Sequence, residues 1–157
     1  MYTFRSGGSR TPQSRNRAQC HLVLGWDGTV REPVRLLLGF GSKVVIVAPE
    51  KPDSLPAGAG FVEGRPDDPG VLRRAGIGEA EAVLVALPVP EARLALAAAK
   101  KLNDRARLVA SVQESGSGPA LRAAGAGLAV DAREEAGREM VRLMLAAEPA
   151  GPPRAGK

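Results

Sequence analysis

Short apolar runs alternate with longer amphipathic segments along most of the chain. The apolar runs, several of them rich in β-branched residues, predict six strands, at residues 21–26, 43–48, 60–64, 80–87, 107–112 and 128–130. Apolar residues at helical spacing predict helices from Thr29 to Leu38 and then at about 68–75, 91–102, 118–124 and 132–147. Three prolines between residues 49 and 56 make the segment after the second strand a loop or a very short helix.

Several residues at the predicted helix ends fit helix caps. Thr29 and Glu32 have the spacing of a capping box at the start of the first helix. Asp67 or Asp68 is expected to cap the second helix, and Gly76 to end it. These signals support the boundaries that the apolar pattern predicts.

The alternation of strand and helix predicts the fold class. It is the pattern of βαβ units, whose crossovers are right-handed. The continuous apolar strands at 43–48 and 82–87 favour a parallel sheet with helices on both faces. We therefore predict an α/β fold: a doubly wound, Rossmann-like parallel sheet of about six strands in the order 3-2-1-4-5-6.

Charge is distributed unevenly along the 157 residues. The chain has 22 basic and 17 acidic residues, but residues 1–19 and 149–157 contain basic residues and no acidic ones. We interpret 1–19 as a disordered basic tail, 20–148 as a single Rossmann-like domain and 149–157 as a disordered Pro/Gly tail. The nearly neutral charge of the body argues against a specific nucleic-acid partner.

The chain also lacks the signals of membrane insertion or secretion. No apolar run approaches the ~20 residues that span a bilayer. Residues 1–19 contain no apolar segment of the kind found in secretory signals. We expect a cytoplasmic protein, and peripheral contact of its basic tails with the inner face of the membrane stays open.

The turn after the first strand is the candidate ligand site. In doubly wound sheets a Gly-x-Gly-x-x-Gly loop at this place binds a dinucleotide pyrophosphate. Here the corresponding residues are Gly25, Trp26, Asp27, Gly28, Thr29 and Val30. Asp27 stands at the second glycine position, where a carboxylate repels phosphate. We expect any nucleotide ligand to bind at Gly25, Trp26, Asp27, Gly28, Thr29 and Glu50, with weak or no affinity for NAD.

Glu50 follows the second strand, where the acid that binds a ribose normally stands. Ala48 occupies the usual position, and Glu50 comes two residues later. A ribose contact and a solvated loop carboxylate are both compatible with this placement. For Trp26, stacking on a base and packing at the end of the sheet are equally compatible.

Residues for enzymatic chemistry are sparse. The one histidine, His21, and the one cysteine, Cys20, are adjacent on a strand and therefore point to opposite faces of the sheet. The one tyrosine, Tyr2, lies in the N-terminal tail, so a Tyr-x-x-x-Lys pair of a dehydrogenase is missing. The residues therefore favour a protein that is not an enzyme and has no metal site. An NAD(P)-dependent oxidoreductase or another nucleotide-binding Rossmann protein is the alternative.

Several segments together resemble the N-terminal lobe of the regulator-of-potassium-conductance (RCK) family, also called the Trk-system nucleotide-binding domain. These segments are Gly25-Trp26, Gly41–Val47, Phe61–Gly64, Val71–Ile77, Ala82–Val85 and Leu121–Ala126. The Gly-Trp pair is similar to the channel-linked branch of that family. The resemblance implies a cytoplasmic, ligand-sensing regulatory domain or subunit of a potassium or other cation channel or transporter. Its dinucleotide site would be degenerate.

The final predicted helix carries more apolar surface than a single sheet face needs. Met140, Leu143, Met144 and Ala147 form one stripe at helical spacing, and Val141 and Leu145 form a second beside it. One stripe can cover the sheet, and the other needs a further partner. We therefore expect a homo-oligomer, at least a dimer, built partly on this helix.

Overall fold

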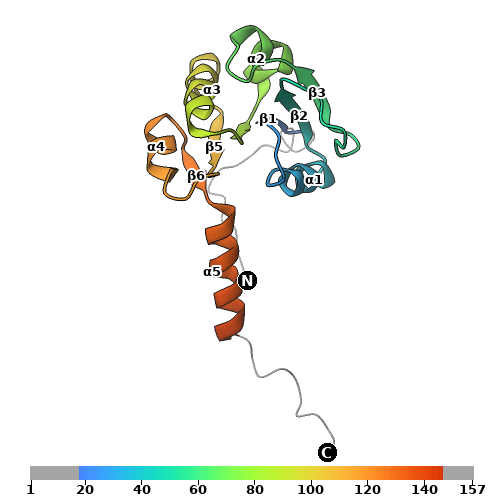
Figure 1. Ribbon diagram of the computed structural model, residues 1–157. Coiled ribbons are helices and arrows are strands. Elements are labelled where there is room, and N and C mark those ends of the chain that lie inside the picture. The colour runs from blue at the N-terminus through green and yellow to red at the C-terminus, as the bar shows by residue number, and fades with distance from the viewer. Residues whose placement is uncertain (1–17, 147–157) are drawn as a thin grey trace, which may run out of the picture.

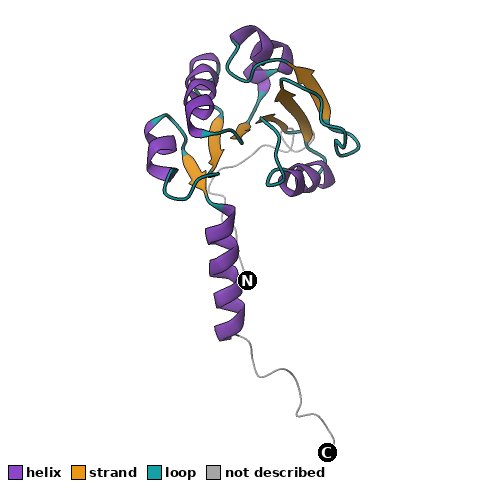
Figure 2. Cartoon of the chain, viewed as in Figure 1, coloured by secondary structure: helices purple, strands orange, loops and turns teal. Residues whose placement is uncertain are grey.

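The computed structural model describes residues 18–146. The expected tails, residues 1–17 and 147–157, lie outside the described residues, as does Ala147 of the predicted apolar stripe. Within the described part, the alternation of strands and helices that the sequence predicts is present throughout (Figures 1 and 2).

Six parallel strands form one sheet. They are β1 (Cys20–Leu24), β2 (Lys43–Ala48), β3 (Gly60–Glu63), β4 (Ala82–Val85), β5 (Arg107–Ser111) and β6 (Leu128–Val130). Their order is β3-β2-β1-β4-β5-β6, and every neighbouring pair is parallel. The predicted doubly wound topology is thus confirmed. The predicted strand at 80–87 is shorter in the structure, since β4 ends at Val85.

The helices cover the two faces of this sheet unequally. They are α1 (Arg31–Gly39), α2 (Pro69–Ala75), α3 (Val89–Leu102), α4 (Gly118–Ala123) and α5 (Ala132–Ala146), with a short 3₁₀ helix at Ile77–Glu79. The crossovers that contain α2, α3 and α4 run to the opposite face from α1, because the chain reverses its direction across the sheet after β3. The loop between β2 and β3 adds no helix beside α1.

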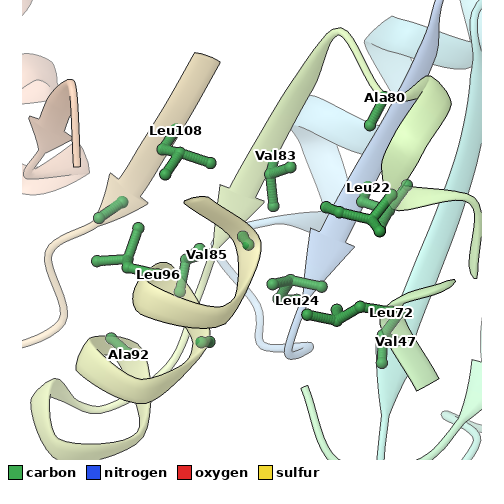
Figure 3. Packing of buried hydrophobic residues seen from close by; sticks show 14 of the residues in the cluster. Leu22, Leu24, Val47, Leu72, Ala80, Val83, Val85, Ala92, Leu96 and Leu108 are labelled. Carbon is green, nitrogen blue, oxygen red and sulfur yellow. The ribbon is translucent and has the colours of Figure 1, made fainter. Parts of the chain in front are cut away.

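The larger part of the core lies under α2, α3 and α4. Alternate residues of the strands point into it, among them Leu22, Leu24, Val83 and Leu108, and Leu96 of α3 packs against them (Figure 3). All five are buried. A smaller cluster under α1 contains Val23, Val30, Val34, Val44, Ile46 and Ala86. The period-two alternation of the strands therefore serves two cores, one on each face.

The face that carries α1 is open over β4, β5 and β6. Leu84 and Val109 point to this face and are half-buried. Together with Val23, Val130 and the side of α1, they line a cavity of about 340 Å³. Its lining is apolar except for His21, Thr29 and Ser111. We call this region the open sheet face.

Helix α5 does not cover the open sheet face. It leaves the end of β6 and projects away from the body (Figure 1). Met140, Val141, Leu143, Met144 and Leu145 are all more than half exposed. The expectation that one stripe of this helix covers the sheet is therefore wrong for this chain, because α5 points away from that face. Both apolar surfaces, on the helix and on the sheet, are without a partner in the described structure.

The helix caps agree with the sequence at α2 and differ at α1. Asp68 accepts hydrogen bonds from the backbone N–H groups of Gly70 and Val71, and Gly76 ends α2 in the left-handed conformation. The capping box of Thr29 and Glu32 does not form. The Thr29 hydroxyl is 2.6 Å from the Asp27 carboxylate, and Glu32 pairs with Arg35, because a closer partner is available to each of them.

The chain leaves β1 through a glycine that no other residue can replace without strain. Gly25 has a φ of +90°, and its N–H donates to the carbonyl of Val47, 2.8 Å away. A Cβ at this position would lie 2.3 Å from the carbonyl oxygen of Ala86. The turn after β1 is therefore packed directly against the backbone at the end of β4.

Replacement of Gly25 with alanine is expected to destabilise the fold by about 2–4 kcal/mol, because it combines a left-handed φ with a backbone clash. The control is Gly28→Ala, since Gly28 lies in the same turn with no atom within 4 Å of an added Cβ. Urea denaturation measures both. Equal midpoints for the two variants would contradict the close approach at Gly25.

Candidate functional site

The carboxyl ends of β1, β4 and β5 bring the candidate site together. The strands are paired in register, so Leu24 lies between Val47 and Val85 and the turn after β1 emerges at the edge where β5 also ends. Ligands bind at this edge in doubly wound sheets, next to the strand where the order reverses. Here β1 is that strand, because β2 and β4 lie on either side of it.

Asp27 is the centre of the hydrogen bonds at this edge. Its Oδ1 accepts from the backbone N–H of Thr29 at 2.8 Å and lies 2.6 Å from the Thr29 hydroxyl. Its Oδ2 accepts from the side-chain amide of Gln113 at 2.6 Å. The Thr29 hydroxyl also lies 3.3 Å from the hydroxyl of Ser111. Both carboxylate oxygens are therefore engaged, one within the turn and one across to the β5 side.

This arrangement changes what the turn can bind. Backbone N–H groups in a turn between strand and helix are the donors that normally hold phosphate. The N–H of Thr29 is already used by the carboxylate of Asp27. A phosphate at this place would meet an anion and would have to displace it from three partners.

Two residues of the site, Ser111 and Gln113, were not among the residues that the sequence predicts. Ser111 is buried at the end of β5, and Gln113, two residues later, is half-buried. The contact between Gln113 and Asp27 joins positions 86 residues apart. The predicted strand order was a usable signal, since it places the end of β5 at the same edge as the turn after β1.

Trp26, Gly28 and Glu50, the other predicted site residues, differ in their exposure and in their place at this edge. Trp26 is half-buried and packs against the smaller core cluster, which favours its structural role over that of a free stacking surface. Gly28 is exposed. Glu50 is also exposed, in the loop that follows β2, and Pro49 beside it lines a separate cavity of about 230 Å³. The turn 25–29 is therefore one cluster, and Glu50 stands apart on the neighbouring loop.

The separate cavity continues the edge toward β3. Arg65 and Asp67 line it together with Leu87 and Glu91. Arg65 donates two hydrogen bonds to Asp67, at 2.8 and 3.0 Å, and the hydrogen bond lowers the pKa of the Asp67 carboxyl. The lining of the separate cavity therefore combines this ion pair with apolar residues such as Leu87.

Comparison with known families now identifies the chain. Residues 21–132 match the family model of the TrkA-N domain, which is more than half of the chain. The chain belongs to the TrkA-N domain family. The match confirms the family that the segments from Gly25 to Ala126 resemble.

Solved structures agree with this TrkA-N assignment. The GsuK channel bound to NAD is 25% identical, with a TM-score of 0.68 over 80% of this chain, but the match covers 23% of that channel chain. The TrkA-N domain of the inner membrane protein YbaL from Escherichia coli is 20% identical, with a TM-score of 0.70, and the match covers 82% of this chain and 98% of that one. The Kef CTD from Shewanella denitrificans in its AMP-bound form is 16% identical, with a TM-score of 0.69 and 83% coverage of each chain.

The three matches to this TrkA-N domain differ in sequence identity and in the share of each chain that they cover. The last two identities are low and show the fold alone. The chain spans about a quarter of the length of the GsuK channel chain. A search of curated proteins finds no match.

Within residues 18–146, no group of three or more His, Cys, Asp or Glu side chains is placed to hold a metal ion. Among the helices of the same residues, none is long and apolar enough to cross a membrane.

The histidine of this TrkA-N domain lies at the far end of the open sheet face. His21 lines the 340 Å³ cavity at the start of β1. Partial burial lowers the pKa of its imidazole, and Arg107 adds to the effect while Glu81 opposes it. The folded state therefore favours the neutral ring. On the adjacent residue, burial raises the pKa of the Cys20 thiol, which disfavours the reactive thiolate.

The lowered pKa of His21 predicts a loss of stability in acid. As the pH falls through the ordinary histidine value, the unfolded chain binds the proton before the folded one does, so unfolding becomes easier. In His21→Leu, the free energy of unfolding is expected to change less between about pH 7.5 and about pH 5.5 than it does in the parent chain. Urea titrations at both pH values measure it, and an unchanged difference in the variant would show that His21 does not contribute.

Proposed function

We propose that this TrkA-N domain is a ligand-sensing regulatory domain or subunit of a cation channel or transporter, with a degenerate dinucleotide site and no enzymatic activity of its own. The observation that carries this proposal is the occupation of the turn after β1 by the carboxylate of Asp27. The fold retains the edge at which nucleotides bind, but the phosphate donors of the turn are partly used inside the chain.

The proposed ligand is a nucleotide whose phosphate does not need the Asp27 turn, with AMP as the first candidate. The similar Kef CTD was solved in its AMP-bound form, and the similar GsuK channel was solved with NAD. In this chain the ligand would lie over Gly25–Thr29 and reach toward Glu50. A dinucleotide places its pyrophosphate at the turn, where Asp27 opposes it, so AMP is favoured over NAD.

The side chains at the site support a binding role rather than catalysis. Those that meet there are Asp27, Thr29, Ser111 and Gln113. Nucleophilic catalysis needs a base that activates the hydroxyl. Asp27 contacts the Thr29 hydroxyl, but its other oxygen is engaged by Gln113, and His21 lies at the other end of the cavity.

Isothermal calorimetry with NAD and AMP tests the role of Asp27. The parent chain is expected to bind NAD weakly or not at all, and Asp27→Gly is expected to strengthen NAD binding at least about tenfold, because it removes a like charge from the turn. The matched control is Asp53→Gly, which removes an exposed acid from the loop after β2. Micromolar or tighter binding of NAD to the parent chain would contradict the proposal.

The exposed faces of α5 support the proposed homo-oligomer. Its charged residues already pair with one another, since Arg138 contacts Glu134 and Glu135 and Arg142 contacts Glu139. The apolar residues on the other side have no such partners in the described structure. Because apolar surface favours burial, we propose that α5 packs against a second copy of the chain and that a two-fold dimer is the basic unit.

Light scattering tests this dimer. The parent chain is expected at twice its monomer mass of 16.3 kDa, and Met144→Asp is expected to raise the dissociation constant at least about 100-fold, because a charge is buried in an apolar contact. Arg142→Gln changes the net charge by the same amount on the charged side and is expected to leave the dimer intact. A monomeric parent chain would contradict the proposed interface.

A further inference from the structure

Helix α5 is attached to the body at its first turn. Asp131 accepts from the backbone N–H groups of Arg133 and Glu134 and so caps the helix. The guanidinium of Arg133 donates to the carbonyl oxygen of Gln113 at 2.9 Å. Among residues 18–146, this is the hydrogen bond that joins α5 to the body of the domain.

The same residue, Gln113, contacts the candidate site with its side chain. Its amide donates to Asp27 at 2.6 Å, while its carbonyl accepts from Arg133. Asp27 in turn is fixed by the N–H of Thr29. A continuous series of hydrogen bonds therefore leads from the turn after β1, through Gln113 two residues after the end of β5, to the first turn of α5.

The length of α5 magnifies any change at its base. Its 15 residues extend about 22 Å, and a tilt of about 10° at the first turn displaces the far end by about 4 Å. The exposed residues Met144 and Leu145 lie near that far end. A small movement of Gln113 would thus change where the apolar face of the helix is presented.

We infer that Gln113 is a positioning residue that couples occupancy of the candidate site to the direction of α5. This inference rests on the proposed function, because the turn at Asp27 is taken as the ligand site. A ligand phosphate that lies over the turn repels the Asp27 carboxylate, and when the carboxylate moves the Gln113 amide loses its acceptor. Gln113 then relaxes, and the carbonyl that orients Arg133 moves with it. Ligand and α5 position are linked because the ligand favours one of two arrangements.

The experiment measures the distance between α5 and the body by electron spin resonance. Spin labels are attached at Lys101→Cys on α3 and Ala146→Cys on α5, both exposed positions, in a Cys20→Ser background. Labelled chain is diluted into unlabelled chain, so that distances within one copy dominate in a dimer. Thermal melting of each variant verifies that it is folded.

The labelled parent is expected to show one narrow distance distribution. Asp27→Ala and Gln113→Ala are each expected to lose this narrow peak, and the double variant is expected to lose no more than either single one, because both act through the same hydrogen bond. Asp27→Asn retains one acceptor oxygen, for either the Thr29 N–H or the Gln113 amide, and is expected to broaden the peak less than Asp27→Ala. A Gln113→Ala variant that melts like the parent and keeps its narrow peak would overturn the inference, as would additive effects in the double variant.

Addition of AMP to the labelled parent separates this inference from the proposed function. If AMP binds by displacing Asp27, the narrow peak shifts in the parent and not in Gln113→Ala. If AMP has no effect on the parent while the Asp27 and Gln113 variants lose the peak, the coupling stands and AMP as the ligand is wrong.

Discussion

A parallel sheet must be covered on both faces, because its strands carry apolar residues on both sides. Crossover helices supply that cover, and here α2, α3 and α4 cover one face fully while α1 covers half of the other. The uncovered half, over β4 to β6, ends at the carboxyl edge where Thr29 and Ser111 meet. The incomplete cover and the candidate site are thus neighbours, and α5 starts beside both, since Ala132 also lines the cavity.

At that edge, the carboxylate of Asp27 lies on backbone and side-chain donors that could otherwise hold a phosphate. The turn after β1 keeps the glycine that its backbone needs, Gly25, because a side chain there would strike the carbonyl of Ala86. At the second glycine position the carboxylate of Asp27 engages the N–H of Thr29 and the amide of Gln113. Under the proposed function, this carboxylate lowers the affinity of the turn for phosphate, as expected for a domain that responds to a ligand rather than one that holds a cofactor permanently.

The sequence predicts the fold well and the site in part, for physical reasons. The strands follow from continuous apolar runs, and their order follows from right-handed crossovers. Asp68 and Gly76 act locally at the ends of α2, so these caps are also visible in the sequence. Thr29 was expected to cap α1, but the helix begins after Val30, and the N–H and hydroxyl of Thr29 both contact the nearby carboxylate of Asp27. The partner of Asp27 on the β5 side, Gln113, depends on contacts between distant segments. Periodicity also reveals the apolar face of α5 without showing what covers it.

If the carboxylate of Asp27 occupies the turn in place of a phosphate, a crystal structure of the chain grown in millimolar NAD is the sharpest test. Asp27 is expected to keep its contacts with the Thr29 N–H and the Gln113 amide, with no pyrophosphate in the turn. Density for a pyrophosphate bound to the N–H of Thr29, with the Asp27 side chain rotated away, would contradict it.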